Sequence, residues 1–186
     1  MTVTEGQTNV VLMTDHLSAT DTDTDDTTLI YTVTNVTNGT LTINGSTWAS
    51  GSNDSFTQQD INVGDVLYTH DGSPTAIDGF TYSVADTSGN TLSGQTFTIN
   101  ILPVNDAPVA MADTLTVDEG GESVLSLAAN DGDEEGNLDP GTITITSAPS
   151  SGRLVVNTDG TVSFSHDGSE AATDTFAYTI ADDQGA

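Results

Sequence analysis

Near the middle of the chain stands the stretch Leu102-Pro103-Val104-Asn105-Asp106-Ala107-Pro108-Val109. The residues before it, Thr96–Ile101, alternate apolar and polar side chains with a period of two, and a second alternating run begins at Leu115; both patterns are typical of half-buried strands. The two prolines fix φ and lack a backbone N–H, so we expect sheet pairing to stop between them. The stretch therefore predicts a joint between two β domains, residues 1–104 and 105–186, and its amide and carboxylate bring oxygen ligands to that joint.

The charge balance excludes several kinds of partner. The sequence holds 28 acidic residues and one basic residue, Arg153, which gives a formal net charge of −27. Binding to nucleic-acid phosphates or to an anionic membrane surface needs clustered Lys and Arg, so we expect neither nucleic acid nor direct membrane contact. High net charge with 34% hydrophobic content can also accompany disorder, but the periodic apolar runs between turn residues argue against it.

The chain has no cysteine, which excludes a disulfide framework, a thiolate zinc site and a cysteine nucleophile. No run approaches the length of a membrane span. Met1 is followed by neither a basic region nor an apolar region, so no signal peptide is predicted in this sequence. If the protein is exported, we expect the chain to be an internal fragment or to use another signal.

Short runs rich in Thr, Val, Ile and aromatic residues recur along the chain, separated by Gly, Asn and Asp. No segment shows a helical period, so an all-β class is predicted. The apolar positions of these runs are Leu29/Tyr31/Val33, Leu41/Ile43, Val66/Tyr68, Phe80/Tyr82/Val84, Ile143/Ile145, Leu154/Val156, Val162/Phe164 and Phe176/Tyr178/Ile180.

Internal similarity is the strongest signal in the sequence. Two segments, 68–73 and 78–86, recur 96 residues later, whereas Val3–Gly6 recurs 114 residues later as Val117–Gly120. The two offsets predict that the first copy holds about 18 additional residues, in and around Trp48–Gly64. Each copy has runs for roughly seven strands in ~80–105 residues, which is the size of an immunoglobulin-like sandwich.

The second copy ends sooner than the first. After Asp86 the first copy continues into the alternating run up to Leu102, but after Asp182 only four residues follow. The second domain is therefore predicted to lack its last strand, which leaves an exposed sheet edge that invites another strand. We expect the chain to be part of a longer array.

Taken together, these residues resemble bacterial cadherin-like tandem repeats. The first unit is similar to the chondroitin-sulfate-proteoglycan (CSPG) type through Ser55–Ile61 and Val66–Gly72. The second is similar to the shorter cadherin-like type of large secreted, RTX-type adhesins through Asn130-Asp131-Gly132-Asp133. The joint Val104–Pro108 is similar to the linker between cadherin domains.

The resemblance implies Ca²⁺ at the domain joint, held by a Glu of the first strand, carboxylates near the base of the leading domain, the linker, and Asp residues of the next domain. Carried over by position, the ligands on the leading side are Glu5, Asp60, Asn105 and Asp106, and those of the second domain are Asp131, Asp133 and Asp182. The same positions in the first domain, which face a preceding repeat, are Asp21, Asp23 and Asp86. The family's acidic pair near the base is reduced here to Asp60 beside two glutamines.

Physical chemistry points the same way. Ca²⁺ prefers six to eight hard oxygen ligands in adaptable geometry. Two carboxylates ~4 Å apart repel each other by about 4 kcal/mol at an effective dielectric constant near 20, so several of them at one joint favour an intervening cation. We expect a loose hinge without Ca²⁺ and a rod with it.

The acidic loops also allow a local loop site or a solvated turn, and an acidic halophilic surface is a further alternative without specific metal sites. An EF-hand is excluded because flanking helices are missing.

Other residues allow a functional and a structural interpretation. His70 and His166 each precede Asp-Gly, a common turn pair, and their recurrence in both copies favours a scaffold role over catalysis. Trp48 lies in the additional segment and fits a core anchor or a sugar-stacking platform. No nucleophile elbow or catalytic triad is visible.

The sequence thus predicts two tandem cadherin-like β-sandwiches of a secreted or surface bacterial protein, acting without catalysis as a calcium-rigidified spacer or adhesive stalk whose partners are adjacent repeats. The alternative is a carbohydrate- or protein-binding module with its specificity near Trp48, whose partners are surface glycans or proteins. A third possibility is an accessory domain of an enzyme.

Overall fold

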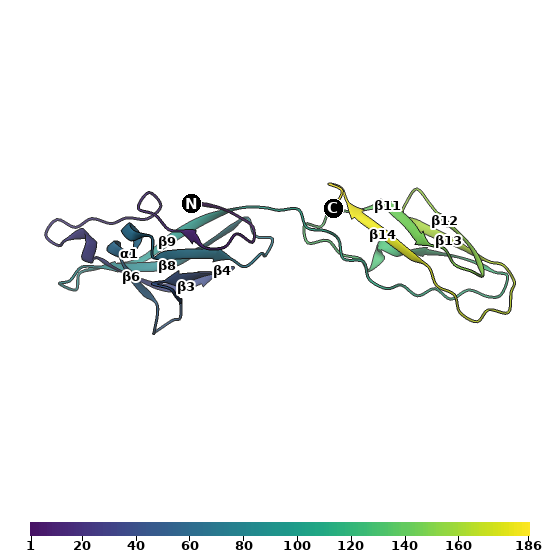
Figure 1. Cartoon of the computed structure of the whole chain (residues 1–186), viewed down its shortest axis with the longest axis horizontal. Helices are drawn as coiled ribbons and strands as arrows, with labels where there is room; N and C mark the ends of the chain where they lie inside the picture. The colour runs from purple at the N-terminus through teal and green to yellow at the C-terminus, as the bar shows by residue number, and fades with distance from the viewer. The chain divides into compact units, whose positions relative to one another are not determined.

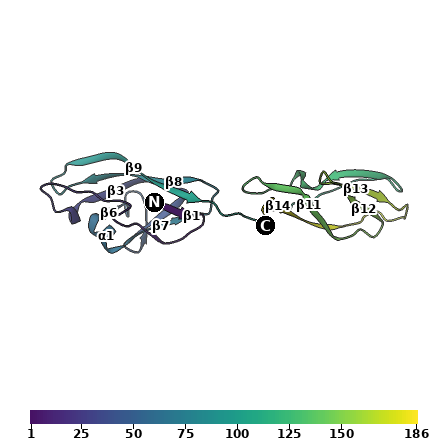
Figure 2. The same cartoon turned by 90° about the horizontal axis from the view of Figure 1, so that it is seen from above.

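The computed structural model describes all residues from 1 to 186 and divides them into two compact units, Met1–Val104 (unit 1) and Asn105–Ala186 (unit 2). Strands dominate both units, as the alternating runs predict (Figure 1). Each unit is built from two sheets, which Figure 2 shows from a second direction. The predicted all-β class is confirmed.

Unit 1 pairs its strands into a five-stranded and a four-stranded sheet. The first has the order β1-β9-β8-β3-β6, with β1 Thr2–Thr4, β9 Thr91–Leu102, β8 Ile77–Ala85, β3 Ile30–Thr37 and β6 Ser55–Thr57. The second has the order β2-β7-β4-β5, with β2 Val10–Val11, β7 Val66–His70, β4 Gly39–Ile43 and β5 Ser46–Thr47. All pairs are antiparallel except β1 with β9, which is parallel.

The core of unit 1 forms from the inward side chains of these strands. Tyr31 stacks on Phe56 with ring centroids 5.1 Å apart, and Phe80 stacks on Phe97 at 4.8 Å. Both pairs join neighbouring strands, so the aromatic residues tie β3 to β6 and β8 to β9. Each fully buried apolar side chain contributes about 1.5–3 kcal/mol, which makes this alternation the main source of stability.

One short α-helix departs from the expectation that no helix is present. Helix α1 spans Gln58–Val63 and directly follows β6, and a 3-10 turn, η1, spans Asp26–Thr28 before β3. Thr57 and Asp60 form a capping box at the start of α1, and Gly64 ends it in the left-handed conformation. Six residues are too few to show a helical period, so only these caps mark the helix in the sequence.

Unit 2 has a three-stranded and a two-stranded sheet. The first has the order β10-β13-β12 and the second pairs β11 with β14 alone. The bounds are β10 Glu122–Ser126, β11 Leu138–Ser147, β12 Gly152–Val156, β13 Thr161–His166 and β14 Ala177–Asp182, with a 3-10 turn, η2, at Leu127–Ala129. Its fully buried core is small and centres on Leu127, Ile143 and Val162.

The strand expected from Leu115 onward does not form, because residues 110–118 have no sheet partner. The counterpart of this segment in unit 1 is β1, which pairs with β9. Unit 2 has no strand in the position of β9. The side chains nevertheless alternate, with Leu115 and Val117 half-buried and their neighbours exposed.

The two units differ by an insertion at the predicted place. In unit 1, residues 44–65 connect β4 to β7, and in unit 2 the corresponding strands β12 and β13 are joined by residues 157–160 alone. The difference is the 18 residues that the two sequence offsets predict. The inserted segment carries β5, β6 and α1, and its Trp48 is half-buried against the core of unit 1.

The repeated histidines hold two turns together in both units. The Nδ1 atom of His70 accepts hydrogen bonds from the backbone N–H groups of Gly6 and Gly72, each at 3.1 Å. His166 does the same with Gly120 at 3.2 Å and Gly168 at 3.1 Å. The motifs that recur at different offsets therefore meet at an equivalent contact, which fits the structural interpretation of both histidines.

Replacing His70 by Ala is expected to destabilise unit 1 by about 3 kcal/mol, because His70 is only 2% exposed and its loss removes a buried side chain together with the acceptor of two backbone N–H groups. The matched change His166→Ala should cost unit 2 about 1–2 kcal/mol, since His166 is half-buried. Urea denaturation of both variants measures the difference. Equal effects, or none at His70, would contradict the assigned role.

The repeated aspartates Asp78 and Asp174 occupy different surroundings. Asp78 is buried and accepts hydrogen bonds from the hydroxyl groups of Tyr68 and Thr37. Asp174 is exposed and accepts the Ser151 N–H at 2.6 Å. Hydrogen bonds from the backbone N–H groups of Ser151 and Ser150 lower the pKa of Asp174 to about 2.

The pKa of Asp174 predicts an acid-sensitive contribution to unit 2. Because the pKa in the folded state lies below the ordinary value of 3.8, the stabilisation is fully present above about pH 4 and is lost as the pH falls toward 2. The variant Asp174→Asn should therefore lose less thermal stability between pH 5 and pH 2 than the natural chain. Melting curves over this range check it, and parallel losses would refute it.

Candidate metal centre

Glu5 follows β1 and lies at the end of unit 1 where β9 finishes. Its Oε2 atom accepts the backbone N–H of Val104 at 3.0 Å, and its own N–H donates to the Leu102 carbonyl at 2.9 Å. The side chain is 9% exposed, and its Oε1 atom is buried without a hydrogen-bond partner. A buried carboxylate oxygen without a donor is costly, so this atom is suited to bind a cation.

In unit 2, Asn105 contacts the last residue of β14 and the turn that follows it. Its Nδ2 donates to Asp182 Oδ2 at 2.5 Å, and its Oδ1 accepts from Gln184 at 2.5 Å. Asp182 is 2% exposed, and its Oδ1 accepts three successive backbone N–H groups from residues 184–186. Burial raises the pKa of Asp182, but hydrogen bonds from Ala186 and Asn105 outweigh it and leave the pKa lowered, so Asp182 is anionic at neutral pH.

The loop 133–137 of unit 2 places three oxygen atoms inside the protein without any donor. These atoms are Asp133 Oδ2, Glu135 Oε1 and Asn137 Oδ1. The other oxygen of Asp133, Oδ1, accepts the N–H groups of Glu135 at 3.1 Å and Asn137 at 3.2 Å, which curls the loop around it. Three buried acceptors at alternate positions match the ligand preference of a hard cation such as Ca²⁺.

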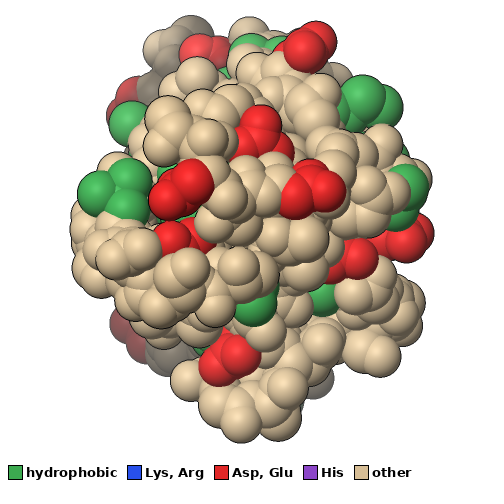
Figure 3. All heavy atoms as spheres, turned by 90° about the vertical axis from the view of Figure 1, so that its left-hand side faces the viewer, with side chains coloured by type: hydrophobic (Ala, Val, Ile, Leu, Met, Phe, Trp, Pro, Cys, Tyr) green, Lys and Arg blue, Asp and Glu red, His purple; other side chains and the backbone are tan.

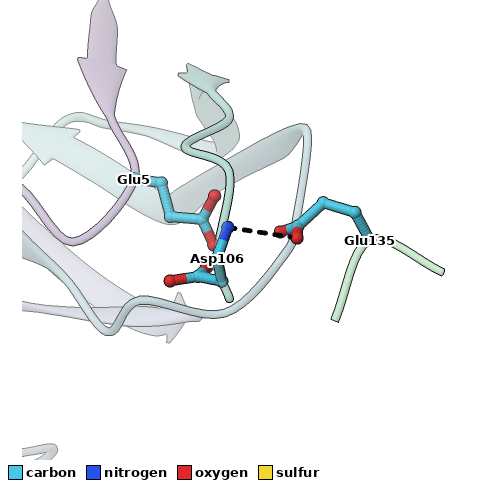
Figure 4. Close-up of side chains that lie close together, drawn as sticks. All are labelled: Glu5, Asp106 and Glu135. Carbon is cyan, nitrogen blue, oxygen red and sulfur yellow. Dashed lines mark hydrogen bonds between the residues drawn. The ribbon is translucent and has the colours of Figure 1, made fainter. Parts of the chain in front are cut away.

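Asp106 approaches the same loop. Its backbone N–H donates to Glu135 Oε2 at 3.2 Å, the bond that Figure 4 draws as a dashed line. Asn137 Nδ2 lies 3.4 Å from Asn105 Oδ1, which links the loop to the start of unit 2. Within unit 2 the structure therefore brings together predicted residues of the joint, Asn105, Asp106, Asp133 and Asp182.

Asp131 has other contacts. Its carboxylate accepts the Met111 N–H at 2.7 Å and the Tyr178 hydroxyl at 3.0 Å. The Tyr178 hydroxyl also lies 3.1 Å from Asp113 Oδ2. Burial raises the pKa of Asp113, and the nearby charge of Asp131 adds to this rise. These bonds tie the segment before Leu115 to β14.

At the opposite end of unit 1, Asp21, Asp23 and Asp86 form an acidic group. The Oδ1 atom of Asp21 accepts the Asp23 N–H at 3.0 Å, and Asp86 caps the turn between β8 and β9 by accepting the Asn90 N–H at 2.7 Å. The carboxylate of Asp21, which shares a hydrogen bond with Asp23, and the charge of Asp86 raise the pKa of Asp23. Figure 3 views the left-hand side of Figure 1 and shows acidic side chains on this face and no basic one.

Asp60 does not lie beside Glu5. It belongs to α1, which follows β6, and β6 pairs with the start of β3 at the end of unit 1 that holds η1. Glu5 lies at the other end of the same sheet, next to Leu102. The Oδ2 atom of Asp60 accepts the Thr57 N–H at 2.7 Å, so its carboxylate caps the helix. The structure therefore corrects the prediction that Asp60 lies at the domain joint.

Sequence reasoning missed Glu135 and Asn137, although the motif Asp133-x-Glu135-x-Asn137 displays oxygen side chains at every second position. Trp48, by contrast, packs against the core of unit 1, which favours the anchor interpretation over a sugar platform. No helix in the structure is long and apolar enough to span a membrane.

Comparison with known proteins finds a matching family model for each unit. Residues 1–101 match the family model described as Cadherin-like, and residues 105–186 match the one described as Bacterial Ig domain.

Curated relatives are extracellular matrix proteins by name. The chain is 44% identical over 78 residues to the extracellular matrix organizing protein FRAS1 of Mus musculus, covering 39% of this chain and 2% of that protein. It is 34% identical over 151 residues to the human FRAS1-related extracellular matrix protein 1, covering 69% of this chain and 7% of that protein. The chain thus spans only a small fraction of each relative's length.

Among solved structures, the chain matches the SGBP-B protein of the Bacteroides ovatus mixed-linkage glucan utilization locus, in complex with a heptasaccharide. The match has 13% identity and a TM-score of 0.26, covering all of this chain and 40% of the other, a likeness too low to carry an argument. The Cadherin-like match alone spans more than half of the residues. The chain therefore belongs to the cadherin-like family.

Proposed function

We propose that the chain is a calcium-stiffened structural segment, a stalk or spacer, of a larger extracellular protein. The observation that carries the proposal is the set of three buried acceptor oxygens of Asp133, Glu135 and Asn137 that have no donor. Such atoms each cost about 1–3 kcal/mol when left unpaired, and a divalent cation removes that cost. The cadherin-like family and the matrix relatives support a structural, non-enzymatic role, and the bacterial Ig match supports a bacterial surface or secreted protein.

The donor set suits Ca²⁺ better than a transition metal. The chain has no cysteine, and the three oxygens belong to two carboxylates and an amide. Asp133, Glu135 and Asn137 would supply the ion with ligands from the loop, and the carboxylates near it, Asp182 and Asp106, would add negative charge. Carboxylate and amide oxygens are the ligands that Ca²⁺ prefers.

The course of the linker supports Glu5 as a further ligand of the ion. Its carboxylate is bonded to the N–H of Val104, and the N–H of Asp106 is bonded to Glu135. These two N–H groups are only two positions apart in the chain, so Glu5 and Glu135 are each bonded to a neighbouring point of the linker. We infer that an ion held by the loop 133–137 draws in the unpaired Oε1 atom of Glu5 and limits the hinge.

The acidic group of Asp21, Asp23 and Asp86 extends the proposal to a repeat that precedes unit 1. These residues occupy the positions in unit 1 that Asp131, Asp133 and Asp182 occupy in unit 2. The hydrogen bond with Asp21 and then the negative charges of Asp21 and Asp86 raise the pKa of Asp23, and a cation would relieve the repulsion between these charges. Adjacent repeats are therefore the expected partners.

Calorimetric titration of the metal-free chain with Ca²⁺ tests the proposal. We expect saturable binding with a dissociation constant of about 10⁻⁴–10⁻³ M, the range of extracellular modules, and a lower melting temperature in chelator. Mg²⁺ at the same concentration should substitute poorly, because it keeps its waters and demands octahedral geometry. Stability that follows total salt and ignores Ca²⁺ would favour a halophilic surface and overturn the proposal.

A further inference from the structure

The dipeptide Asn44-Gly45 forms the whole turn of the hairpin between β4 and β5 in unit 1. Ile43 pairs with Ser46 on either side of this turn. Asn44 has φ of +50° and Gly45 has φ of +76°, and two positive values are the mark of a type I′ turn. Asn followed by Gly is the pair that such a turn favours, and both residues are exposed here. The hairpin opens the insertion that unit 2 lacks.

Two groups of this turn that can react with each other are free. The side-chain amide of Asn44 and the backbone N–H of Gly45 take part in no hydrogen bond, whereas the backbone N–H of Asn44 donates to the Asp65 carbonyl at 2.9 Å. A Cβ atom at Gly45 would have no atom within 4 Å, so open space surrounds the turn. The Gly45 nitrogen, which no side chain shields, can therefore approach the Cγ atom of Asn44 without breaking a contact.

The reaction open to these groups is cyclisation followed by hydrolysis. The Gly45 nitrogen forms a bond to Cγ of Asn44, the Cγ–Nδ2 bond breaks, and ammonia leaves with the proton of the Gly45 N–H. Water then opens the resulting succinimide ring at either carbonyl. Attack at Cγ leaves aspartate in the normal chain, and attack at the backbone carbonyl leaves isoaspartate, whose chain runs through the side chain. Water is the only other reactant, and ammonia is the only product released.

We propose that Asn44 is a site of spontaneous deamidation that loosens the β4–β5 hairpin as the protein ages. Isoaspartate adds a carbon atom to the backbone of a two-residue loop, so the pairing of Ile43 with Ser46 cannot keep its geometry. Either product also adds a carboxylate next to Asp65, in a chain whose net charge is already −27. The proposal is independent of the calcium site.

The loosened hairpin would release the anchor of the insertion. Trp48 directly follows β5, and its backbone N–H donates to the Leu41 carbonyl of β4 at 2.7 Å. Its side chain is half-buried against the core of unit 1. Because Trp48 is the only tryptophan, its fluorescence reports on this contact alone. Deamidation of the turn should therefore move its emission toward that of a solvated indole.

The other Asn-Gly step of the chain, Asn38-Gly39, serves as an internal control. Asn38 also has a positive φ, +39°, and is exposed. Its carbonyl accepts the Asp71 N–H at 3.1 Å, and Gly39 is already paired with β7. A Cβ atom at Gly39 would lie 2.6 Å from the Thr69 carbonyl oxygen, so the backbone is closely surrounded. We expect cyclisation here to be at least ~10-fold slower than at Asn44, because the held backbone cannot adjust to the ring.

Incubation of the full chain at neutral pH and physiological temperature tests the proposal. Tandem mass spectrometry of chymotryptic peptides locates the replaced amide, and labelling by an isoaspartate-specific methyltransferase identifies the rearranged product. We expect conversion at Asn44 at least ~10-fold faster than at Asn38 in the folded chain. In concentrated urea the two rates should converge, because both residues precede a glycine. No conversion at Asn44, or equal rates at both positions in the folded chain, would overturn the proposal.

The variant Asn44→Gly provides the second arm. It removes the reacting amide and keeps the turn, since Gly adopts a positive φ freely. As the product accumulates in the natural chain, the Trp48 emission should move to longer wavelength, whereas the emission of the variant should stay constant over the same incubation. Conversion at Asn44 with unchanged Trp48 emission would show that the hairpin does not respond, and a shift of equal size in the variant would show that it has another cause; either result refutes the proposed loosening.

Discussion

Replacing Asp133 by Asn is expected to remove the calcium-dependent part of the stability of unit 2. Asn retains the Oδ1 acceptor that the N–H groups of Glu135 and Asn137 use, so the loop keeps its hydrogen bonds. The change removes the charge and turns the unpaired Oδ2 into a donor group, which repels a cation. Loss of binding should therefore occur without unfolding of the loop.

The size of this effect follows from binding linkage. At a Ca²⁺ concentration 100 times the dissociation constant, binding stabilises the folded state by about 2.7 kcal/mol. For a unit of this size that corresponds to a rise in melting temperature of about 10–20 °C. Scanning calorimetry with Ca²⁺ and with chelator measures it, and the fluorescence of Trp48, the only tryptophan, identifies the transition of unit 1.

Asp159→Asn is the matched control. Asp159 lies in the turn between β12 and β13 and binds Thr161, so the change removes one negative charge from unit 2 outside the loop 133–137. This variant should keep the full response to Ca²⁺. If Asp133→Asn responds to Ca²⁺ as the natural chain does, the loop is not the metal site.

Replacing Gly79 by Ala is expected to destabilise unit 1 by about 3–5 kcal/mol, enough to unfold much of it. Gly79 has φ of +155°, and a Cβ atom there would lie 2.0 Å from the carbonyl oxygen of Phe97. The backbone of β9 cannot yield without breaking its pairing with β8, where Gly79 faces Thr98. Urea denaturation followed by Trp48 fluorescence measures the loss.

Gly89→Ala separates the clash from the backbone preference. Gly89 also has a positive φ, +92°, but nothing lies within 4 Å of the position of its Cβ atom. The cost should be only about 1–2 kcal/mol, from the left-handed conformation alone. Equal losses for the two variants would show that the contact with Phe97 does not matter.

The strands were predictable because their signal is local. A period of two marks β3, β8 and β9 from the sequence alone, and the two repeat offsets predict an insertion of about 18 residues in and around Trp48–Gly64. The unpaired segment 110–118 was not predictable, because pairing depends on a partner strand and not on the segment's own alternation. Helix α1 was not predicted, because its six residues are too few to show a helical period and only its two caps mark it in the sequence.

The candidate site was predictable only in part, for a related reason. The positions of Asn105, Asp106, Asp133 and Asp182 follow from the resemblance to cadherin-like repeats. Which oxygens of the loop are buried without donors depends on how residues 133–137 fold, so Glu135 and Asn137 emerge only from the structure. The end of unit 1 at which Asp60 lies is set by the pairing of β6 with β3, which no sequence spacing encodes.

The most direct test of a calcium-stiffened joint is small-angle X-ray scattering of the full chain, first with saturating Ca²⁺ and then with excess chelator. The account predicts a single, sharply defined maximum dimension with Ca²⁺ and a broader distribution of distances with a changed maximum in chelator, and Asp133→Asn should resemble the chelated chain under both conditions. Identical scattering with and without Ca²⁺, from a chain shown by calorimetry to bind the ion, would contradict it.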